Sequence, residues 1–360
     1  MARLEKFEVS IGNICVMSCI SDILNYYNLS LSESDVFSFT EAQLFYYKPI
    51  SVEELESFHG EVPLLSVTMG GMKYDIKDML SCIENTFQIK TEFQYGYDKE
   101  EIKDFIVDNI DNRIPVMSLL SRYHLDYIDD KIRDNITHSI NITGYDWKKN
   151  ILYIGDTYLP TIPVKNYIGA VSFESYYNSL IMSKDIFNKQ FLYRNIAIDG
   201  KNAVNFENLT WKQKIKPLKS IAEHYYKSEQ LEGGVLTGQK AYEAFFCSVE
   251  EWMQSDSKEE LFRIVHHRLT NYGGLVLTYS LLLDYVRRLS NGRMNERMKD
   301  IQNQFLMLIK EWKIIANMFL KVSVASYEDI KKNMLGRIAN KIAKTLVEEE
   351  KLYAMLKALS

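Results

Sequence analysis

The stretch THSINITGYDWKKNILYIGD, residues 137–156, decides the fold of the N-terminal half. Polar and apolar side chains alternate over residues 138–144, a polar turn follows at residues 146–150, and residues 151–156 form a second β-branched and aromatic run. Two short alternating runs around a polar turn predict a β-hairpin.

The register of this hairpin brings a histidine to a carboxylate. If Tyr145 pairs with Asn150, His138 lies opposite Thr157 and beside Asp156, within a residue or two. The sequence separation of the two side chains is then explained by strand pairing.

The same kind of pattern extends outward from the hairpin. Residues 113–120 and 170–173 are further β-branched runs, and residues 15–27 and 99–110 have helical periodicity. We therefore expect an α+β domain over residues 1–205.

The pattern changes near residue 205. Beyond it the chain consists of long segments of helical periodicity, and proline becomes rare. We expect an all-α helical domain over residues 206–360, whose two long terminal helices offer a surface for a homodimer.

The composition restricts the function. The 360 residues carry a formal net charge of −5, with Lys interleaved with Asp and Glu, so nucleic-acid binding is not expected. No stretch is long and apolar enough for a membrane span, and the first residues do not form a signal peptide, so we expect a cytoplasmic protein. The four cysteines form neither a disulfide framework nor a zinc motif, and we expect no metal.

One cysteine stands at the start of a helix. Residues 15–27 (CVMSCISDILNYY) carry an apolar stripe, and Gly12 and Asn13 offer a turn and an N-cap just before Cys15. The positive end of the helix lowers the pKa of the Cys15 thiol, and the free N–H of this residue can stabilise an oxyanion. Cys19, one turn later on the stripe, is interpreted as a core residue.

A thiolate nucleophile needs a base that also returns a proton to the leaving group, and a histidine oriented by a carboxylate serves both needs. Cys15 lies far from the hairpin in sequence, as members of such triads usually do. We predict Cys15 as the nucleophile, His138 as the general acid and base, and Asp156 as the residue that orients His138.

The order Cys, His, Asp, with the cysteine at a helix start and the other two on a later hairpin, resembles that of papain-like cysteine peptidases. A narrower resemblance is carried by residues 15–47, with LSLSESDVF at 29–37 and LFYY at 44–47. This run is similar to the N-terminal domain of butirosin biosynthesis protein H. Within that family, the amide synthetases of closthioamide-type polythioamide assembly look like the nearest relatives.

The resemblance implies a papain-like fold for the first domain and an amide-forming acyltransferase of antibiotic biosynthesis. Cys15 would take an acyl group from the phosphopantetheine thioester of an acyl or peptidyl carrier protein and pass it to a small-molecule amine, with no cofactor of its own. The chain has Ile14 where the family commonly has a histidine, and Val9 where papain has its oxyanion glutamine. Asn13 and Ser10 are candidates for the second oxyanion donor.

Two other functions stay open at this point. A cysteine peptidase or amidohydrolase would use the same triad in an open cleft. A non-catalytic scaffold would keep the fold in order to bind a carrier protein or a small molecule, and it would tolerate replacement of Cys15.

Overall fold

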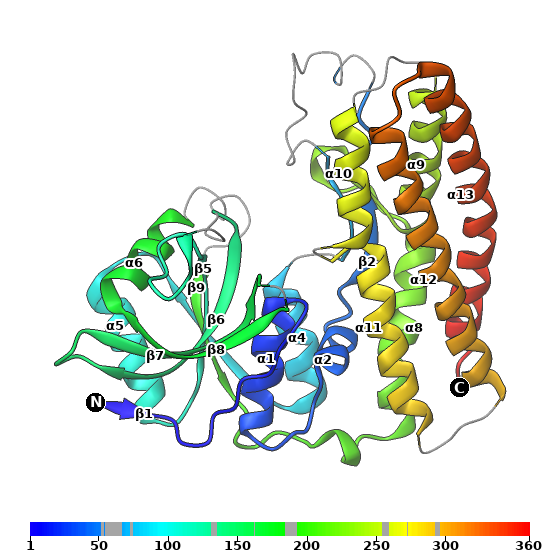
Figure 1. The fold of residues 1–360 in the computed structure, drawn as a ribbon. Coiled ribbons are helices and arrows are strands. Elements are labelled where there is room, and N and C mark those ends of the chain that lie inside the picture. The colour runs from blue at the N-terminus through cyan, green and yellow to red at the C-terminus, as the bar shows by residue number, and fades with distance from the viewer. Residues whose placement is uncertain are drawn as a thin grey trace. The chain divides into compact units, whose positions relative to one another are not determined.

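The computed structural model describes residues 1–51, 54, 67–72, 75–130, 135–161, 163–183, 193–253, 259–271, 273–291 and 296–360. By its internal contacts the chain divides into two compact units (Figure 1). The first unit is formed by Met1–Thr40 and Asp75–Leu209, and the second by Glu41–Tyr74 and Thr210–Ser360.

The first unit is built on an antiparallel sheet with the strand order β4-β9-β5-β6-β7-β8, and β1 also pairs with β6. The strands are β1 (Ala2–Arg3), β4 (Lys90–Tyr95), β5 (Val116–Ser121), β6 (Thr137–Asp146), β7 (Ile151–Leu159), β8 (Lys165–Ser172) and β9 (Tyr193–Asp199). The helices are α1 (Cys15–Tyr26), α2 (Glu33–Phe39), α4 (Ile76–Phe87), α5 (Lys99–Asp111) and α6 (Phe173–Met182). The N-terminal unit is therefore mixed α and β.

The two faces of strand β6 contact different parts of this unit. Ile140 and Ile142 belong to the buried apolar cluster that includes side chains of α5 and α6. Asn141 points the other way, because side chains alternate along a strand, and its Nδ2 donates to the Cys19 carbonyl of α1 at 3.1 Å. At this position of the strand, helix α1 thus packs against β6 on the side of Asn141, and it also contacts β7 (Figure 1).

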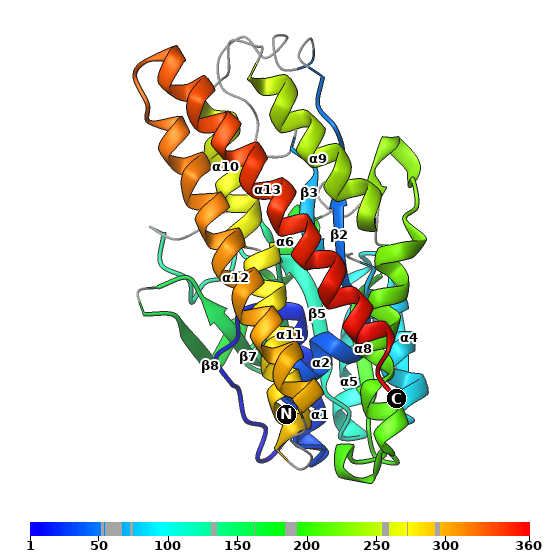
Figure 2. The ribbon, with the colours of Figure 1, turned by 90° about the vertical axis from the view of Figure 1, so that its right-hand side faces the viewer.

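The second unit contains long helices and a small sheet. Its helices are α8 (Trp211–Lys227), α9 (Gly238–Trp252), α10 (Glu259–Thr270), α11 (Leu275–Ser290), α12 (Glu296–Ser323) and α13 (Glu328–Lys357). Figure 2 shows α12 and α13 running side by side. Among the helices that the structure describes, none is apolar over a length that would cross a membrane.

The small sheet corrects the expected domain division. Strand β2 (Gln43–Tyr47) pairs with β3 (Met69–Met72) and with β10 (Leu236–Thr237), so the second unit is not all-α. Residues 41–74 were expected in the first domain, but Phe45 stacks on Tyr242 of α9 with ring centroids 4.3 Å apart. Backbone pairing to β10 and burial against α9 together draw this segment into the helical unit.

The core of the second unit holds a buried carboxyl group. Glu349 of α13 has no exposed surface and accepts hydrogen bonds from the Tyr279 hydroxyl and the Trp312 indole N–H. The Tyr279 hydroxyl also lies 2.8 Å from that of Tyr242 and 2.9 Å from that of Tyr353. Burial raises the pKa of Glu349 to about 7 even though both donors favour its charged form.

Candidate active site

Helix α1 begins at Cys15, and its first turn is capped from outside the helix. The preceding residue, Ile14, makes no side-chain cap. Instead, the Glu33 carboxylate at the start of α2 accepts from the backbone N–H of Asn13 at 2.9 Å, from the N–H of Ile14 and from the Ser18 hydroxyl at 2.9 Å. This carboxylate supplies the negative charge that a helix N-terminus favours and leaves Cys15 at the first helical position.

The Cys15 thiol is half-buried, whereas Cys19 has no exposed surface. The Cys19 sulfur donates to the Ser139 carbonyl at 3.4 Å, and burial raises the pKa of this thiol well above its usual range. Cys19 is therefore a protonated thiol that ties α1 to β6. Of these two thiols, that of Cys15 is the one that solvent can reach, and it interacts with His138.

The candidate base is His138, and its side chain lies next to that of Asp156, the neighbour that the hairpin pattern predicts. His138 Nε2 lies 2.9 Å from Asp156 Oδ2, and neither side chain is exposed to solvent beyond a few per cent. Because Asp156 takes up Nε2, the other ring nitrogen, Nδ1, is the one left for Cys15. The triad residues therefore come together from α1, β6 and β7.

A shift in strand register puts these two side chains on one face. Between β6 and β7, Tyr145 pairs with Leu152, but Ile142 pairs with Ile154, so one residue on β6 is left over as a bulge. Continuing the register beyond the bulge places Asp156 beside residue 140, on the face that His138 shares. Without the bulge, Asp156 would project from the opposite face.

The pairing at the turn itself differs from the expected one. Asp146 pairs with Ile151, where the sequence analysis had assumed that Tyr145 pairs with Asn150. The turn residues explain the difference. The Asp146 carboxylate accepts from the backbone N–H of Lys148 at 3.1 Å, and Asn150 has a left-handed φ of 53°. A four-residue turn therefore closes the hairpin.

From the residues that the structure describes, Asp156 accepts three hydrogen bonds. Besides His138, the Tyr127 hydroxyl donates to Oδ2 at 2.8 Å, and the backbone N–H of Tyr158 donates to Oδ1 at 2.9 Å. Tyr127 lies in the segment after β5 and was not found from the sequence, because nothing in the order of residues connects it with β7. A buried carboxylate with three donors has its charge compensated.

The thiol and the imidazole form a reactive pair. Burial raises the pKa of Cys15, but hydrogen bonding and charge interaction with His138 outweigh it, so that the pKa falls below its usual range. Burial lowers the pKa of His138, yet Asp156 and then Cys15 raise it to about 10. Both shifts are in the direction that favours a thiolate beside an imidazolium.

Ser139 is a second neighbour of the thiol that sequence reasoning missed. Its hydroxyl and its backbone N–H both lower the pKa of Cys15. The β6–β7 ladder ends at the pair Asn141–Gly155, so the backbone of Ser139 is free of β7. That backbone turns to α1 instead, because its carbonyl accepts from Cys19.

The two oxyanion candidates have other partners for their side chains. The Asn13 amide donates to Glu33 at 2.9 Å, and the Ser10 hydroxyl donates to Asp22 at 2.6 Å. Neither side chain makes a described contact with Cys15. The backbone N–H of Cys15, which has no acceptor within its own helix, stays available for an oxyanion.

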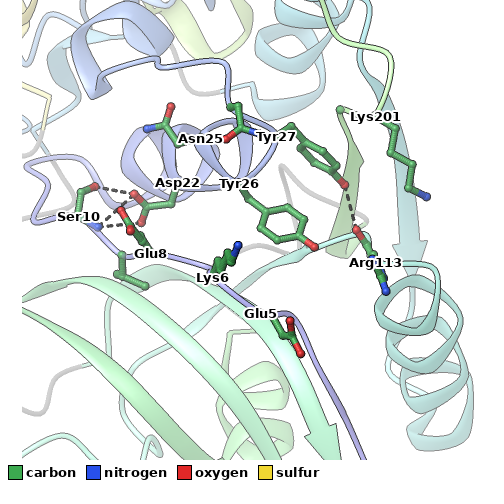
Figure 3. Close-up of a pocket in the computed structure, with 13 residues that line it drawn as sticks. Glu5, Lys6, Glu8, Ser10, Asp22, Asn25, Tyr26, Tyr27, Arg113 and Lys201 are labelled. Atoms are coloured by element: carbon green, nitrogen blue, oxygen red, sulfur yellow. Dashed lines mark hydrogen bonds between the residues drawn. The ribbon is translucent and has the colours of Figure 1, made fainter.

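A cavity of about 850 Å³ lies along the later turns of α1. Figure 3 shows Glu8, Ser10 and Asp22 gathered at one end of it, and Arg113 and Lys201 at the other. Burial raises the pKa of Asp22 to about 6, against the hydrogen bonds from Ser10. The triad residues are not among those that line this cavity.

Metal ligation finds no support in the part of the chain that is described, where no group of three or more His, Cys, Asp or Glu side chains could hold an ion. A nucleophile, a base and an orienting carboxylate together are suited to acyl transfer.

One comparison with known proteins covers the residues of the candidate site. A search of curated proteins finds no match to the chain. A family model does match, and its segment contains Cys15, His138 and Asp156. Residues 14–157, two fifths of the chain, match the model for butirosin biosynthesis protein H, N-terminal, so this segment is similar to that family.

Proposed function

We propose that the protein is a cysteine-dependent acyltransferase that moves an acyl group from a carrier-protein thioester, through an acyl-Cys15 intermediate, onto an amine. The observation that carries the proposal is the half-buried Cys15 thiol at a helix start, with its pKa lowered by His138, whose other nitrogen is held by Asp156. A nucleophile helix packed on an antiparallel sheet that carries histidine and aspartate supports a papain-like class for the first unit.

The first half-reaction needs no external proton source. The Cys15 thiolate attacks the thioester carbonyl, and the backbone N–H of Cys15 donates to the oxyanion. When the tetrahedral intermediate collapses, the carbon–sulfur bond to the phosphopantetheine breaks, and the leaving thiolate takes the proton from the His138 imidazolium. One thioester replaces another, so no ATP is consumed.

In the second half-reaction, His138 acts as a base and Cys15 is the leaving group. Neutral His138 accepts a proton from the amine as its nitrogen attacks the acyl-Cys15 carbonyl, and the Cys15 thiolate leaves. The imidazolium and the thiolate are thereby restored, stabilised by Asp156. The same residues would hydrolyse the acyl-enzyme if water replaced the amine.

The family match over residues 14–157 supports a role in a biosynthetic pathway. The matching family is named for a protein of butirosin biosynthesis, so we assign this chain to antibiotic-type biosynthesis. The proposal includes the relation to amide synthetases of closthioamide-type assembly, with an acyl or peptidyl carrier protein as the donor partner.

The test is intact-protein mass spectrometry after incubation with a panel of acyl carrier-protein thioesters. We expect one acyl adduct on the unmodified protein and on Cys247→Ala, whose thiol is exposed, but none on Cys15→Ala. Adding a panel of amines should remove the adduct and release an amide.

Other outcomes contradict the proposal in different ways. If the adduct is lost to water at a rate that amines do not change, the protein is a hydrolase. If no thioester gives an adduct while Cys15 still reacts with iodoacetamide, acyl transfer from carriers is wrong. If Cys15 shows no reactivity of either kind, the chain is a binding scaffold.

A further inference from the structure

The aspartate of the triad needs external support to keep its orientation. The terminal torsion of an aspartate side chain, between an sp³ and an sp² carbon, has broad minima, so packing alone does not fix the carboxylate plane. In Asp156 the plane is set by its three donors, with Tyr158 on Oδ1 and both His138 and Tyr127 on Oδ2. Tyr127 is the one side chain among them outside the triad.

Tyr127 is itself held by an aromatic partner. Its ring stacks on that of Tyr167, with centroids 4.3 Å apart and planes 4° from parallel. Tyr167 lies directly opposite Asp156 in the β7–β8 ladder, and directly opposed side chains share a face of the sheet. The Tyr127 ring is therefore supported by the cross-strand neighbour of the carboxylate that its hydroxyl contacts.

The Tyr167 ring in turn depends on a glycine. A Cβ atom at Gly169, two residues along β8, would lie 2.3 Å from Cζ of Tyr167. The Tyr167 hydroxyl donates to the Ala170 carbonyl at 3.1 Å, so it is directed away from Asp156, and the ring itself covers this glycine. Glycine at position 169 leaves the room that the stacked pair requires.

We propose that Tyr127 is a positioning residue of the triad: its hydroxyl, set by the Tyr167 ring over Gly169, holds the Asp156 carboxylate against the His138 imidazole. The inference deepens the proposed function, since it concerns the same triad. It needs only a reactive Cys15, and it does not depend on the identity of the acyl donor or of the amine.

The test is the pH dependence of Cys15 alkylation by iodoacetamide, followed by peptide mass spectrometry, which requires no acyl substrate. Tyr127→Phe removes the hydroxyl and keeps the stacked ring. We expect the midpoint of the alkylation profile to rise by about half to one pH unit, because the buried Asp156 carboxylate loses a hydrogen bond. Only part of the energy of that bond affects the interaction of Asp156 with His138.

The matched control is Tyr167→Phe, which keeps the stack and removes a hydroxyl that does not contact Asp156. We expect its profile to equal that of the unmodified protein. Gly169→Ala tests the support of the Tyr127 ring, because the added Cβ displaces the Tyr167 ring. We expect it to raise the midpoint, as Tyr127→Phe does. Circular dichroism checks that each variant is folded.

An unchanged or lowered midpoint in folded Tyr127→Phe would overturn the inference. In that case the Tyr127 hydroxyl either has no effect on the Cys15–His138 pair or weakens the interaction of the Asp156 carboxylate with His138. This outcome is separable from failure of the proposed function, which would appear as absent acyl transfer with a normal alkylation profile. If the triad itself is wrong, the His138→Ala variant will have the same alkylation profile as the unmodified protein.

Discussion

Replacing Asp156 with asparagine removes the charge that the structure places behind His138. The pKa of His138 is raised from 6.5 to about 10, which at 1.36 kcal/mol per pKa unit corresponds to roughly 5 kcal/mol in favour of the imidazolium. Two unit charges 4 Å apart at an effective dielectric constant of 20 interact by about 4 kcal/mol. Both side chains are buried, so the charge of Asp156 accounts for most of the stabilisation.

The asparagine cannot restore what is lost. Its amide oxygen can accept from the Tyr158 N–H, but its NH₂ group then stands where Oδ2 accepts from His138 and Tyr127. We expect the thiolate–imidazolium pair to revert to neutral thiol and imidazole near pH 7. The rate of Cys15 alkylation at pH 7 should fall by at least about tenfold, and the midpoint of its pH profile should rise.

The assay is the rate of carbamidomethylation of the Cys15 peptide between pH 5 and 10, read by mass spectrometry. The control is Asp146→Asn, since Asp146 is also a buried aspartate of the hairpin but lies at its turn. We expect this control to keep the profile of the unmodified protein. A folded Asp156→Asn variant with an unchanged profile would refute the reasoning, because the charge would then not be coupled to the thiol.

Two further predictions concern stability. Between pH 4.5 and about 7 the folded protein keeps a proton on Glu349 that the unfolded chain has lost, so stability falls as the pH rises through this window. Glu349→Gln should therefore raise the free energy of unfolding above pH 7 by up to about 3 kcal/mol, measured by urea unfolding. The control, Glu350→Gln at an exposed position, should not raise it, and equal effects of the two substitutions would contradict the prediction. Glu33→Gln should cost about 1–2 kcal/mol, because a charged acceptor at the start of α1 is lost, and exposed Glu8→Gln should be neutral; a neutral Glu33→Gln would show that the cap contributes nothing.

Local sequence patterns specified the elements that carry the triad. The apolar stripe and the residues before Cys15 predict a helix that begins at this cysteine, and the helix does begin there. Alternation around a polar turn predicts the hairpin, and β6 and β7 form it. Both patterns act over one or two turns of helix or a single pair of strands, so the sequence contains all that is needed to recognise them.

Long-range pairing was not visible in the same way. The segment with Phe45 reads as an aromatic run within the first domain, yet its strand pairs with β10 in the second unit. Tyr127 donates to Asp156, and its ring stacks on that of Tyr167. Such contacts join residues whose sequence separation carries no periodic signal, and only the packed structure brings them together.

The residue pattern alone predicts a thiol at a helix start, and a histidine and an aspartate on the two strands of one hairpin. Whether those two side chains share a face depends on strand pairing in the folded protein. Near the turn, the residue numbers of each pair add up to an odd number, as for Asp146 with Ile151. If this register continued, the residue opposite Asp156 would have an odd number, and Asp156 and His138 would project from opposite faces. The one-residue bulge between Ile142 and Gly144 makes the sum even, and because side chains alternate along a strand, this single irregularity brings the base to its carboxylate.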